Sequence, residues 1–268
     1  MNILVCVKQV PNTHAISIDP KTNTLIREGV ESILNPFDGY ALEAAARLKD
    51  NDKDIRIFTL CMGPKQAVEV LRECLAVSAD TAYLVSDRLF SGSDTLATGY
   101  ILSEAIKYIE VLEEIKFDMI FCGKQAIDGD TAQVGPQIAE CLGLPQITCA
   151  LTCERKGDEL HVLKETEDRK EVVAISFPCL VTFTKPAFEP RLPSVRRKIA
   201  AKKMEIKVIS ADSLPEIDKA RIGLKGSPTQ VRRTFVPPVK KEGAIFKEGA
   251  LEDSARNLAR LLVENGII

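Results

Sequence analysis

The chain has 268 residues, of which 45% are hydrophobic and 28% are charged, a composition typical of a folded globular protein rather than a disordered one. Its formal net charge of −2 gives no reason to expect nucleic acid as a partner. No apolar run approaches the roughly 20 residues that a membrane span needs. The N-terminus, MNILVCVKQV, lacks the basic start and long apolar stretch of a signal peptide. We therefore expect a cytoplasmic protein that does not insert into membranes.

The 8 cysteines do not form any CxxC pair, and most of them lie in apolar runs such as ILVCVK and FTLCMG. In a cytoplasmic protein this placement is typical of buried thiols rather than of disulfides or metal ligands. Cys149 and Cys153 have a CxxxC spacing, but only His14 and His161 could add imidazole ligands. We expect no metal site.

Strands and helices alternate in the first half of the chain. Short apolar runs predict buried strands at residues 3–8, 55–61, 81–85 and 118–122. Apolar residues at helical spacing predict helices at residues 37–49, 63–76, 96–112 and 132–142. Alternation of this kind predicts right-handed βαβ units and a parallel sheet.

The pattern changes after Pro145. Residues 148–155, 161–165 and 172–176 are expected to form antiparallel strands, with Lys156–Asp158 as a hairpin turn, and residues 178–184 a further strand. The basic, proline-rich stretch that starts at Lys185 is more typical of a solvated face than of a binding site.

We expect residues 1–222 to form one α/β domain and residues 223–268 to form an extended arm with a helix. The helix is expected at 253–266, capped by Asp253 or Ser254 and ended by Gly266. Because such an arm has little core of its own, we expect it to lie on a partner chain. The predicted fold class is therefore α/β: a mostly parallel sheet with helices on both faces, an antiparallel hairpin insertion and a C-terminal arm.

The segment with the clearest potential for binding is the loop Gly123–Gly135, GKQAIDGDTAQVG. The chain lacks a G-x-G-x-x-G motif after its first strand and a Walker A motif, which disfavours the usual hydride-transfer and P-loop enzymes. The loop follows a predicted parallel strand, and open α/β sheets bind ligands at that end of their strands. Gly123 and Gly129 permit close backbone approaches.

The side chains of this loop suit a nucleotide. Asp130 is predicted to cap the next helix, with Gln133 as its capping-box partner. The free amides of that helix start, with Thr131, suit a phosphate, and Asp128 suits ribose hydroxyls. The alternative is a polar, well-capped loop without a ligand.

Two more loops are expected at the same sheet edge. Asn35–Asp38 opens the first helix, and Met62–Pro64 follows the second strand. Three loops meeting there would form a crevice of nucleotide size. The alternative for Asn35 and Asp38 is a helix-capping role in place of direct contact with a ligand.

Several segments resemble the electron-transfer flavoprotein beta subunit family along nearly the whole chain: VKQVP, NPFDGYALEAA, CMGP, GKQAIDGDTAQVGPQIAE and AAKKMEIKVI. The resemblance implies an adenine-nucleotide-binding, Rossmann-like fold and a partner alpha subunit that carries FAD. It also implies that the adenine nucleotide contacts Cys6, Asn35, Pro36, Phe37, Asp38, Met62, Gly123, Lys124, Gln125, Ala126, Ile127, Asp128, Gly129, Asp130, Thr131, Ala132, Gln133 and Val134.

A further segment, VSDRLFSGSDTLAT at Val85–Thr98, resembles the flavin-bifurcating branch of that family. This resemblance implies FAD in place of AMP, with NADH as electron donor and ferredoxin as one acceptor. The implied extra contacts are Gly92, Ser93, Asp94 and Thr95. The same letters are also an ordinary helix-capping sequence, so an AMP-binding subunit that only supports the alpha-subunit flavin remains the alternative.

The segment EPRLPSVR at residues 189–196, here named the docking segment, resembles the family's recognition loop for a flavin-containing dehydrogenase. Leu192 or Val195 would be its apolar anchor, rimmed by Arg191, Arg196 and Arg197. No side chain is expected to act as nucleophile or general base. A magnesium-dependent nucleotide hydrolase using Asp128 and Asp130 is the alternative from another class of protein.

Overall fold

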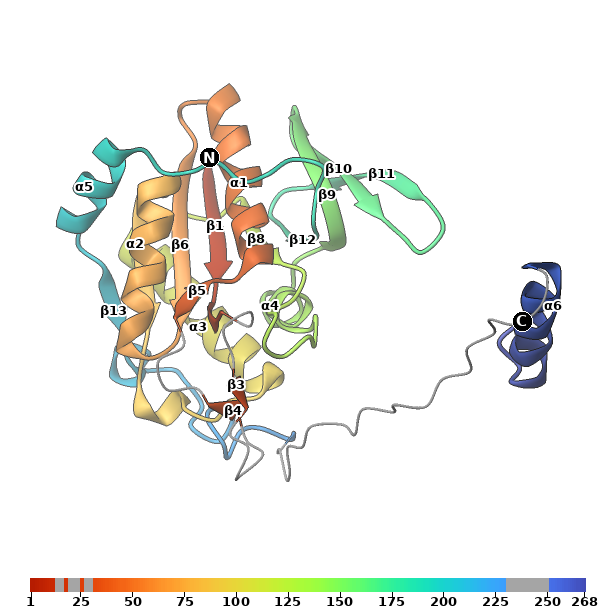
Figure 1. Cartoon of the computed structure of the whole chain (residues 1–268). Coiled ribbons are helices and arrows are strands. Elements are labelled where there is room, and N and C mark those ends of the chain that lie inside the picture. Colours follow the sequence, from red (N-terminus) through yellow and green to blue (C-terminus); the bar gives the residue numbers. More distant parts are fainter. Residues whose placement is uncertain (13–16, 19–24, 27–30, 230–250) are drawn as a thin grey trace.

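The computed structural model describes residues 1–12, 17–18, 25–26, 31–229 and 251–268 of the chain (Figure 1). Their main feature is a nine-stranded sheet in the order β11-β10-β9-β12-β8-β1-β6-β7-β13. All neighbouring strands from β9 to β13 along this order are parallel, and β10 is antiparallel to both of its neighbours, β9 and β11.

The strands of the sheet are β1 (Asn2–Val7), β6 (Arg56–Met62), β7 (Thr81–Val85), β8 (Met119–Gly123), β9 (Gln146–Lys156), β10 (Glu159–Glu165), β11 (Lys170–Ser176), β12 (Cys179–Phe183) and β13 (Lys207–Ile209). Two small antiparallel pairs lie outside it: β2 (Gln9–Pro11) with β5 (Ser32–Leu34), and β3 (Ser17–Ile18) with β4 (Leu25–Ile26).

Helices cover both faces of the sheet (Figure 1). One face packs against α1 (Pro36–Asn51) and α2 (Val68–Val77), and α5 (Val195–Lys203) packs on α2. The other face packs against α3 (Thr95–Leu112) and α4 (Val134–Leu142). Short 3-10 turns occupy Lys65–Ala67, Arg88–Phe90 and Ala211–Ser213. The predicted α/β fold is confirmed.

The alternation of side chains along β1 explains why a short strand supports two cores. Ile3, Val5 and Val7 lie in the core under α1 and α2, whereas Leu4 and Cys6 lie in the core under α3 and α4. This follows from the two-residue period of a strand. Since both faces are covered by helices, the strand consists almost entirely of apolar residues, as parallel strands in this position require.

The order of the strands fixes where a ligand can bind. From β1 the chain proceeds to β6 and β7 on one side, and then returns to place β8 on the other side of β1. The loops that follow β1 and β8 therefore diverge to opposite faces of the sheet. A reversal of this kind leaves a crevice at the carboxyl ends of the strands, where open α/β sheets bind their ligands.

Some local predictions need correction. No side chain of the described residues caps α4, which starts at Val134, and Asp130 instead accepts a hydrogen bond from Gln125. The prediction that Asp130 caps this helix was wrong. The stretch 195–203 of the basic segment is a helix, which the sequence did not predict.

The last helix, α6 (Leu251–Glu264), begins two residues earlier than predicted. Asp253 and Ser254 therefore lie in its first turn and are not its cap, whereas Gly266, at φ 64°, follows its end as predicted. Much of the predicted arm, residues 230–250, lies outside the described residues. None of the helices in the described part of the chain is long and apolar enough to cross a membrane.

Candidate functional site

A pocket of about 400 Å³ lies at the carboxyl ends of β1, β6 and β8. We name it the cofactor pocket. It is lined by Cys6, Val7, Lys8, Asn35, Asp38, Met62, Phe90, Gly92, Ser93, Asp94, Thr95, Thr98, Leu102, Cys122, Gly123, Lys124, Gln125, Ala126, Gly129, Thr131, Ala132, Gln133, Val134 and Gly135. Its volume is in the range of small-molecule and cofactor sites.

The close approach of α1 to β8 forms one wall of the pocket. A Cβ atom on Gly123 would lie 2.3 Å from Oδ1 of Asp38 and 2.7 Å from the carbonyl carbon of Phe37. Only glycine therefore fits at the end of β8. This absence of a side chain lets the first turn of α1 reach the end of the neighbouring strand.

Asp38 joins the two strands on either side of the switch point. Its carboxylate accepts hydrogen bonds from the backbone N–H of Lys8 (2.8 Å) and from that of Gly123 (3.1 Å). Burial raises the pKa of Asp38 to about 7, against the opposing effect of these hydrogen bonds. The side chain is thus a structural tie between α1, β1 and β8 that also lines the pocket.

Asn35 holds the loop after β8. Its side-chain nitrogen donates to the carbonyl of Gln125 (2.8 Å), and its side-chain oxygen accepts from the backbone N–H of Ile127 (3.2 Å). No side-chain cap hydrogen bond is present at the start of α1, where Asn35 is the N-cap residue. Of the two roles left open for Asn35, capping through its side chain is therefore wrong, and its amide fixes the loop instead.

An ion pair crosses the loop on the same side. Nζ of Lys8 lies 2.7 and 2.8 Å from the two carboxylate oxygens of Asp128. This places the ammonium group of Lys8 at the wall of the pocket, where the carboxylate of Asp128 balances its charge. It also engages Asp128, which we had expected to bind ribose hydroxyls, and Asp128 is not among the described residues that line the pocket.

The start of α3 forms the opposite wall. The carboxylate of Asp94 accepts hydrogen bonds from the backbone N–H groups of Ala97 (3.0 Å) and Thr229 (2.9 Å). Partial burial disfavours its charge, but these amides outweigh that effect and hold the pKa of Asp94 below its usual value. The hydroxyl of Ser93 accepts from the backbone N–H of Gly223 (3.1 Å), so residues 223–229 are tied to this loop.

Thr95 lines the pocket and links the start of α3 to the loop before α4. Its hydroxyl donates to the side-chain oxygen of Gln133 (2.8 Å), which belongs to the loop before α4. The starts of α1, α3 and α4 thus all contribute residues to one pocket. The positive ends of helix dipoles favour anions, so this arrangement suits a phosphate or pyrophosphate.

Most of the residues that the sequence pointed to line the pocket. Five do not: Pro36, Phe37, Ile127, Asp128 and Asp130. Phe37 packs edge-to-face against Tyr40, with ring centroids 6.3 Å apart. Ile127, Asp128 and Asp130 instead form hydrogen bonds with Asn35, Lys8 and Gln125, which do line it.

Sequence reasoning missed Val7, Lys8, Phe90, Thr98, Leu102, Cys122 and Gly135. Two signals could have found some of them. Thr98 and Leu102 follow Asp94 at intervals of four residues and so share its helix face. Cys122 ends the predicted strand at residues 118–122, at the sheet edge where a ligand was expected.

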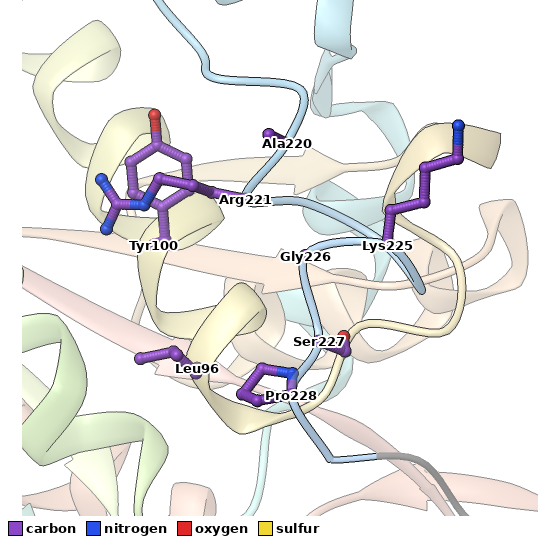
Figure 2. A pocket seen from close by; sticks show the side chains of 8 residues that line it. All are labelled: Leu96, Tyr100, Ala220, Arg221, Lys225, Gly226, Ser227 and Pro228. Carbon is purple, nitrogen blue, oxygen red and sulfur yellow. The ribbon is translucent and has the colours of Figure 1, made fainter.

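A second pocket lies beside α3 and outside the cofactor pocket (Figure 2). Its volume is about 290 Å³, and Leu96, Tyr100, Arg221, Lys225 and Pro228 contribute side chains to it. The guanidinium of Arg221 stacks over the ring of Tyr100, 3.8 Å from its centroid. Tyr100 is already engaged through its hydroxyl, which accepts from the backbone N–H of Asp218 (2.9 Å).

The docking segment lies on the surface beside α1 and α5. Leu192 is 91% exposed and Val195 is 75% exposed, and Arg196 is exposed as well. Arg191 differs from these three, because its guanidinium binds Glu43 and Asp50 of α1. The structure thus places the two expected anchors in solvent and places Arg191 in an intramolecular network.

Comparison with known proteins shows the family of the chain. The family model "Electron transfer flavoprotein domain" matches residues 22–214. The chain is 54% identical over 248 residues to the electron transfer flavoprotein subunit beta of Megasphaera elsdenii, covering 92% of each chain. It is 47% identical to the subunit beta of Thermoanaerobacterium thermosaccharolyticum, over the full length of both chains. It is 44% identical to the caffeyl-CoA reductase-Etf complex subunit CarD of Acetobacterium woodii, again over the full length of both.

The two full-length matches cover the whole cofactor pocket and the docking segment, and the family model covers both except for Cys6, Val7 and Lys8. The chain therefore belongs to the electron transfer flavoprotein family and corresponds to its beta subunit.

Proposed function

We propose that the cofactor pocket holds FAD rather than AMP, and that this chain accepts electrons from NADH and divides them between two acceptors. Beta subunits of this family pair with an alpha subunit and with other redox proteins. The proposal concerns the cofactor of this chain and the course of its electrons.

The observation that supports FAD is the continuity of the pocket from the β8 loop to the start of α3. Gly92, Ser93, Asp94 and Thr95 line the same cavity as Cys6 and Gly123–Ala126. A mononucleotide needs only one such region. A cavity that continues to a second helix start offers room and polar groups for a flavin attached to the nucleotide.

The residues fit the parts of FAD. The starts of three helices suit its pyrophosphate. Met62, Phe90 and Leu102 supply apolar surface for an aromatic ring. When bound, FAD supplies hydride acceptance from NADH and the release of two electrons, one to ferredoxin and one through the alpha-subunit FAD to a flavin dehydrogenase. The chain itself binds, orients and shields the cofactor.

An anaerobic titration of the heterodimer with NADH tests this course of electrons. We expect NADH to bleach the flavin absorbance. We also expect ferredoxin to be reduced only when a flavin dehydrogenase and its oxidised substrate are present to take the other electron. Ferredoxin reduction that does not depend on the dehydrogenase would contradict the proposal, as would a flavin spectrum that NADH leaves unchanged.

Asp94→Ala should lower the FAD content of the purified heterodimer and also lower the free energy of unfolding by about 1 kcal/mol, because Asp94 caps α3. Asp87→Ala is the matched control. The Asp87 carboxylate likewise accepts from two backbone amides, those of Leu89 and Ala211, but it is not among the described residues that line the pocket. Equal FAD loss in both variants would show that Asp94 acts only through stability.

Leu192→Ala should raise the KM for a flavin-containing dehydrogenase about tenfold, since a buried apolar anchor contributes on the order of 1–2 kcal/mol to an interface. The name of the relative from Acetobacterium woodii places that protein with a caffeyl-CoA reductase, which supports a flavin enzyme acting on CoA esters as partner. Val172→Ala, at a 67% exposed position on β11, is the control and should leave the KM unchanged. If Leu192→Ala left the KM unchanged, Leu192 would not be an anchor for the dehydrogenase.

A further inference from the structure

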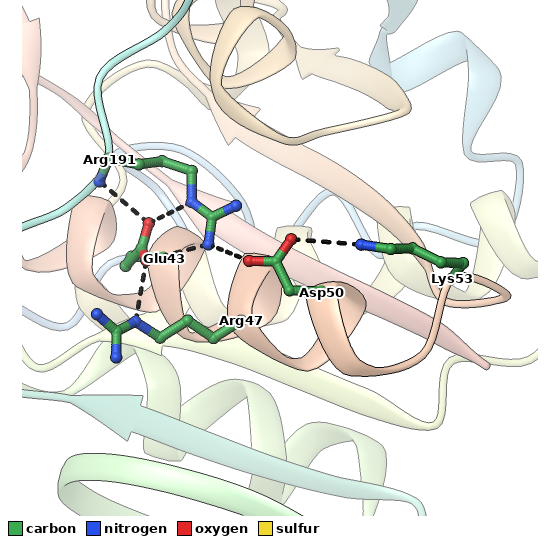
Figure 3. A network of polar contacts seen from close by, with 5 residues as sticks. All are labelled: Glu43, Arg47, Asp50, Lys53 and Arg191. Carbon is green, nitrogen blue, oxygen red and sulfur yellow. Dashed lines mark hydrogen bonds and ion pairs between the residues drawn. The ribbon is translucent and has the colours of Figure 1, made fainter.

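A cluster of charged side chains fixes the docking segment to α1 (Figure 3). Oε2 of Glu43 accepts hydrogen bonds from the backbone N–H of Arg191 (3.1 Å) and from its Nε (2.8 Å). Nη2 of Arg191 donates both to Oε1 of Glu43 (3.2 Å) and to Oδ2 of Asp50 (2.7 Å). One arginine thus holds two carboxylates that lie two turns apart on the same helix.

Glu43 is unusual in being charged and only 3% exposed. Burial would raise the pKa of its carboxyl, but the hydrogen bonds from Arg191 and Arg47 outweigh this effect and keep the pKa below its usual value. A buried carboxylate is costly unless it is paired and hydrogen-bonded, so Glu43 is a poor choice for filling space alone. Its partners indicate instead that it holds the backbone of Arg191 in place.

The chain is anchored on both sides of Arg191. Before it, the guanidinium of Arg47 stacks over the ring of Phe188, 3.6 Å from its centroid. After it, the hydroxyl of Ser194 accepts from the backbone N–H of Arg197 and caps α5. Arg72 of α2 then donates to the carbonyl of Ala201 (3.1 Å), which holds α5 against α2.

Leu192 lies between these anchors and is 91% exposed. Its backbone follows directly on the clamped backbone of Arg191. A side chain held on an ordered backbone loses less conformational entropy when a partner covers it than one on a mobile loop. The anchors therefore favour binding without touching the partner.

We propose that Glu43, Arg191 and Asp50 form a clamp that positions the docking segment, so that Leu192 meets the partner dehydrogenase already ordered. The inference rests on the docking role given to Leu192 under the proposed function. Arg191 is then a positioning residue: its guanidinium serves the clamp and is not a rim contact for the partner.

The test uses the complete heterodimer and a purified flavin-containing acyl-CoA dehydrogenase that the wild-type heterodimer reduces. Glu43→Gln removes the charge and one acceptor from the clamp. We expect it to raise the KM for the dehydrogenase about fivefold, with kcat within about twofold and flavin content unchanged, because docking alone is impaired. Asp50→Asn, at the exposed end of the clamp, should raise the KM about twofold. It is a second test of the clamp that does not depend on whether the Glu43 variant folds.

A double-mutant cycle shows whether the clamp acts through Leu192. If it does, Glu43→Gln combined with Leu192→Ala should raise the KM no further than Leu192→Ala alone. Arg155→Gln is the matched control and should leave the KM unchanged, because Arg155 forms an exposed pair with Asp52 at the end of α1 (3.1 Å) and lies outside the clamp.

Hydrogen exchange measures the order of the docking segment directly. The backbone amides of residues 191 and 192 should exchange hydrogen faster in Glu43→Gln than in wild type.

The outcomes separate the two proposals. If Leu192→Ala raises the KM but Glu43→Gln and Asp50→Asn do not, the clamp is overturned and the docking role stands. If Leu192→Ala leaves the KM unchanged, the docking role fails and the clamp proposal fails with it. Fully additive effects of Glu43→Gln and Leu192→Ala would also overturn the clamp, because the two side chains would then act independently.

Discussion

Gly123→Ala should destabilise the chain by about 2–3 kcal/mol, the cost of forcing an extra methyl group into a closely packed place. The new Cβ would lie 2.3 Å from Oδ1 of Asp38 and 2.7 Å from the backbone carbon of Phe37, so α1 would have to move away from β8. Since both elements line the cofactor pocket, we expect the variant to be purified with little bound nucleotide. Urea unfolding and nucleotide release measure the two effects.

Gly129→Ala is the matched control in the same loop. Apart from Gly129 itself and its two neighbours in the chain, no described atom lies within 4 Å of the position that its Cβ would take. The substitution should change the free energy of unfolding by no more than about 0.5 kcal/mol, as expected at a surface position. If both variants lost similar stability, the close approach of α1 to Gly123 would not be the cause of the loss.

Asp38→Asn should lower the free energy of unfolding by about 2–3 kcal/mol near pH 5. Two backbone N–H groups, from Lys8 and Gly123, point at the two carboxylate oxygens. An asparagine would turn its NH2 group towards one of these donors and leave that donor unsatisfied. A protonated carboxyl avoids this problem, because its hydroxyl oxygen can still accept a hydrogen bond.

The loss in the free energy of unfolding caused by Asp38→Asn should become smaller as the pH rises. Burial raises the folded-state pKa of Asp38 to about 7, above its value in the unfolded chain. The stability that Asp38 contributes is then fully present below the unfolded pKa and is lost as pH rises through about 7, by up to about 1.4 kcal/mol per pH unit. Asparagine does not titrate. Urea unfolding of the wild type and of Asp38→Asn between pH 5 and pH 7 measures the difference in their free energies of unfolding. A difference that grows with pH would contradict the raised pKa of Asp38.

The sequence was sufficient to predict the helices and strands in which the spacing of apolar residues reflects burial against the sheet. β7 was predicted with its observed bounds, and α1 and α3 to within two residues at each end, because their apolar residues face cores on the covered sheet. The convergence of the loops at one edge was also predictable, since it follows from the alternation of strands and helices.

The missed elements depend on contacts between distant residues. α5 is strongly basic and has a single buried residue, Ala201, so it has no apolar stripe that could predict a helix. It is held by Arg72 from α2, more than a hundred positions earlier in the chain. β13 has only three residues, and among the described strands it pairs with β7 alone.

The polar ties of the site were hidden for the same reason. Lys8 pairs with Asp128 across 120 positions, and Arg191 binds Glu43 across 148. A sequence motif shows which polar residues are present but not which of them satisfy one another. Asp128 and Arg191 were therefore expected to face a ligand and a partner, whereas the structure places both in ion pairs within the chain.

A count of the bound nucleotides tests the central claim most directly. The chain would be purified with its alpha subunit and denatured, and the released nucleotides would be separated and quantified. We expect two FAD per heterodimer, one from the alpha subunit and one from the cofactor pocket. One FAD and one AMP per heterodimer would contradict the account, and would leave this chain as a support for the alpha-subunit flavin.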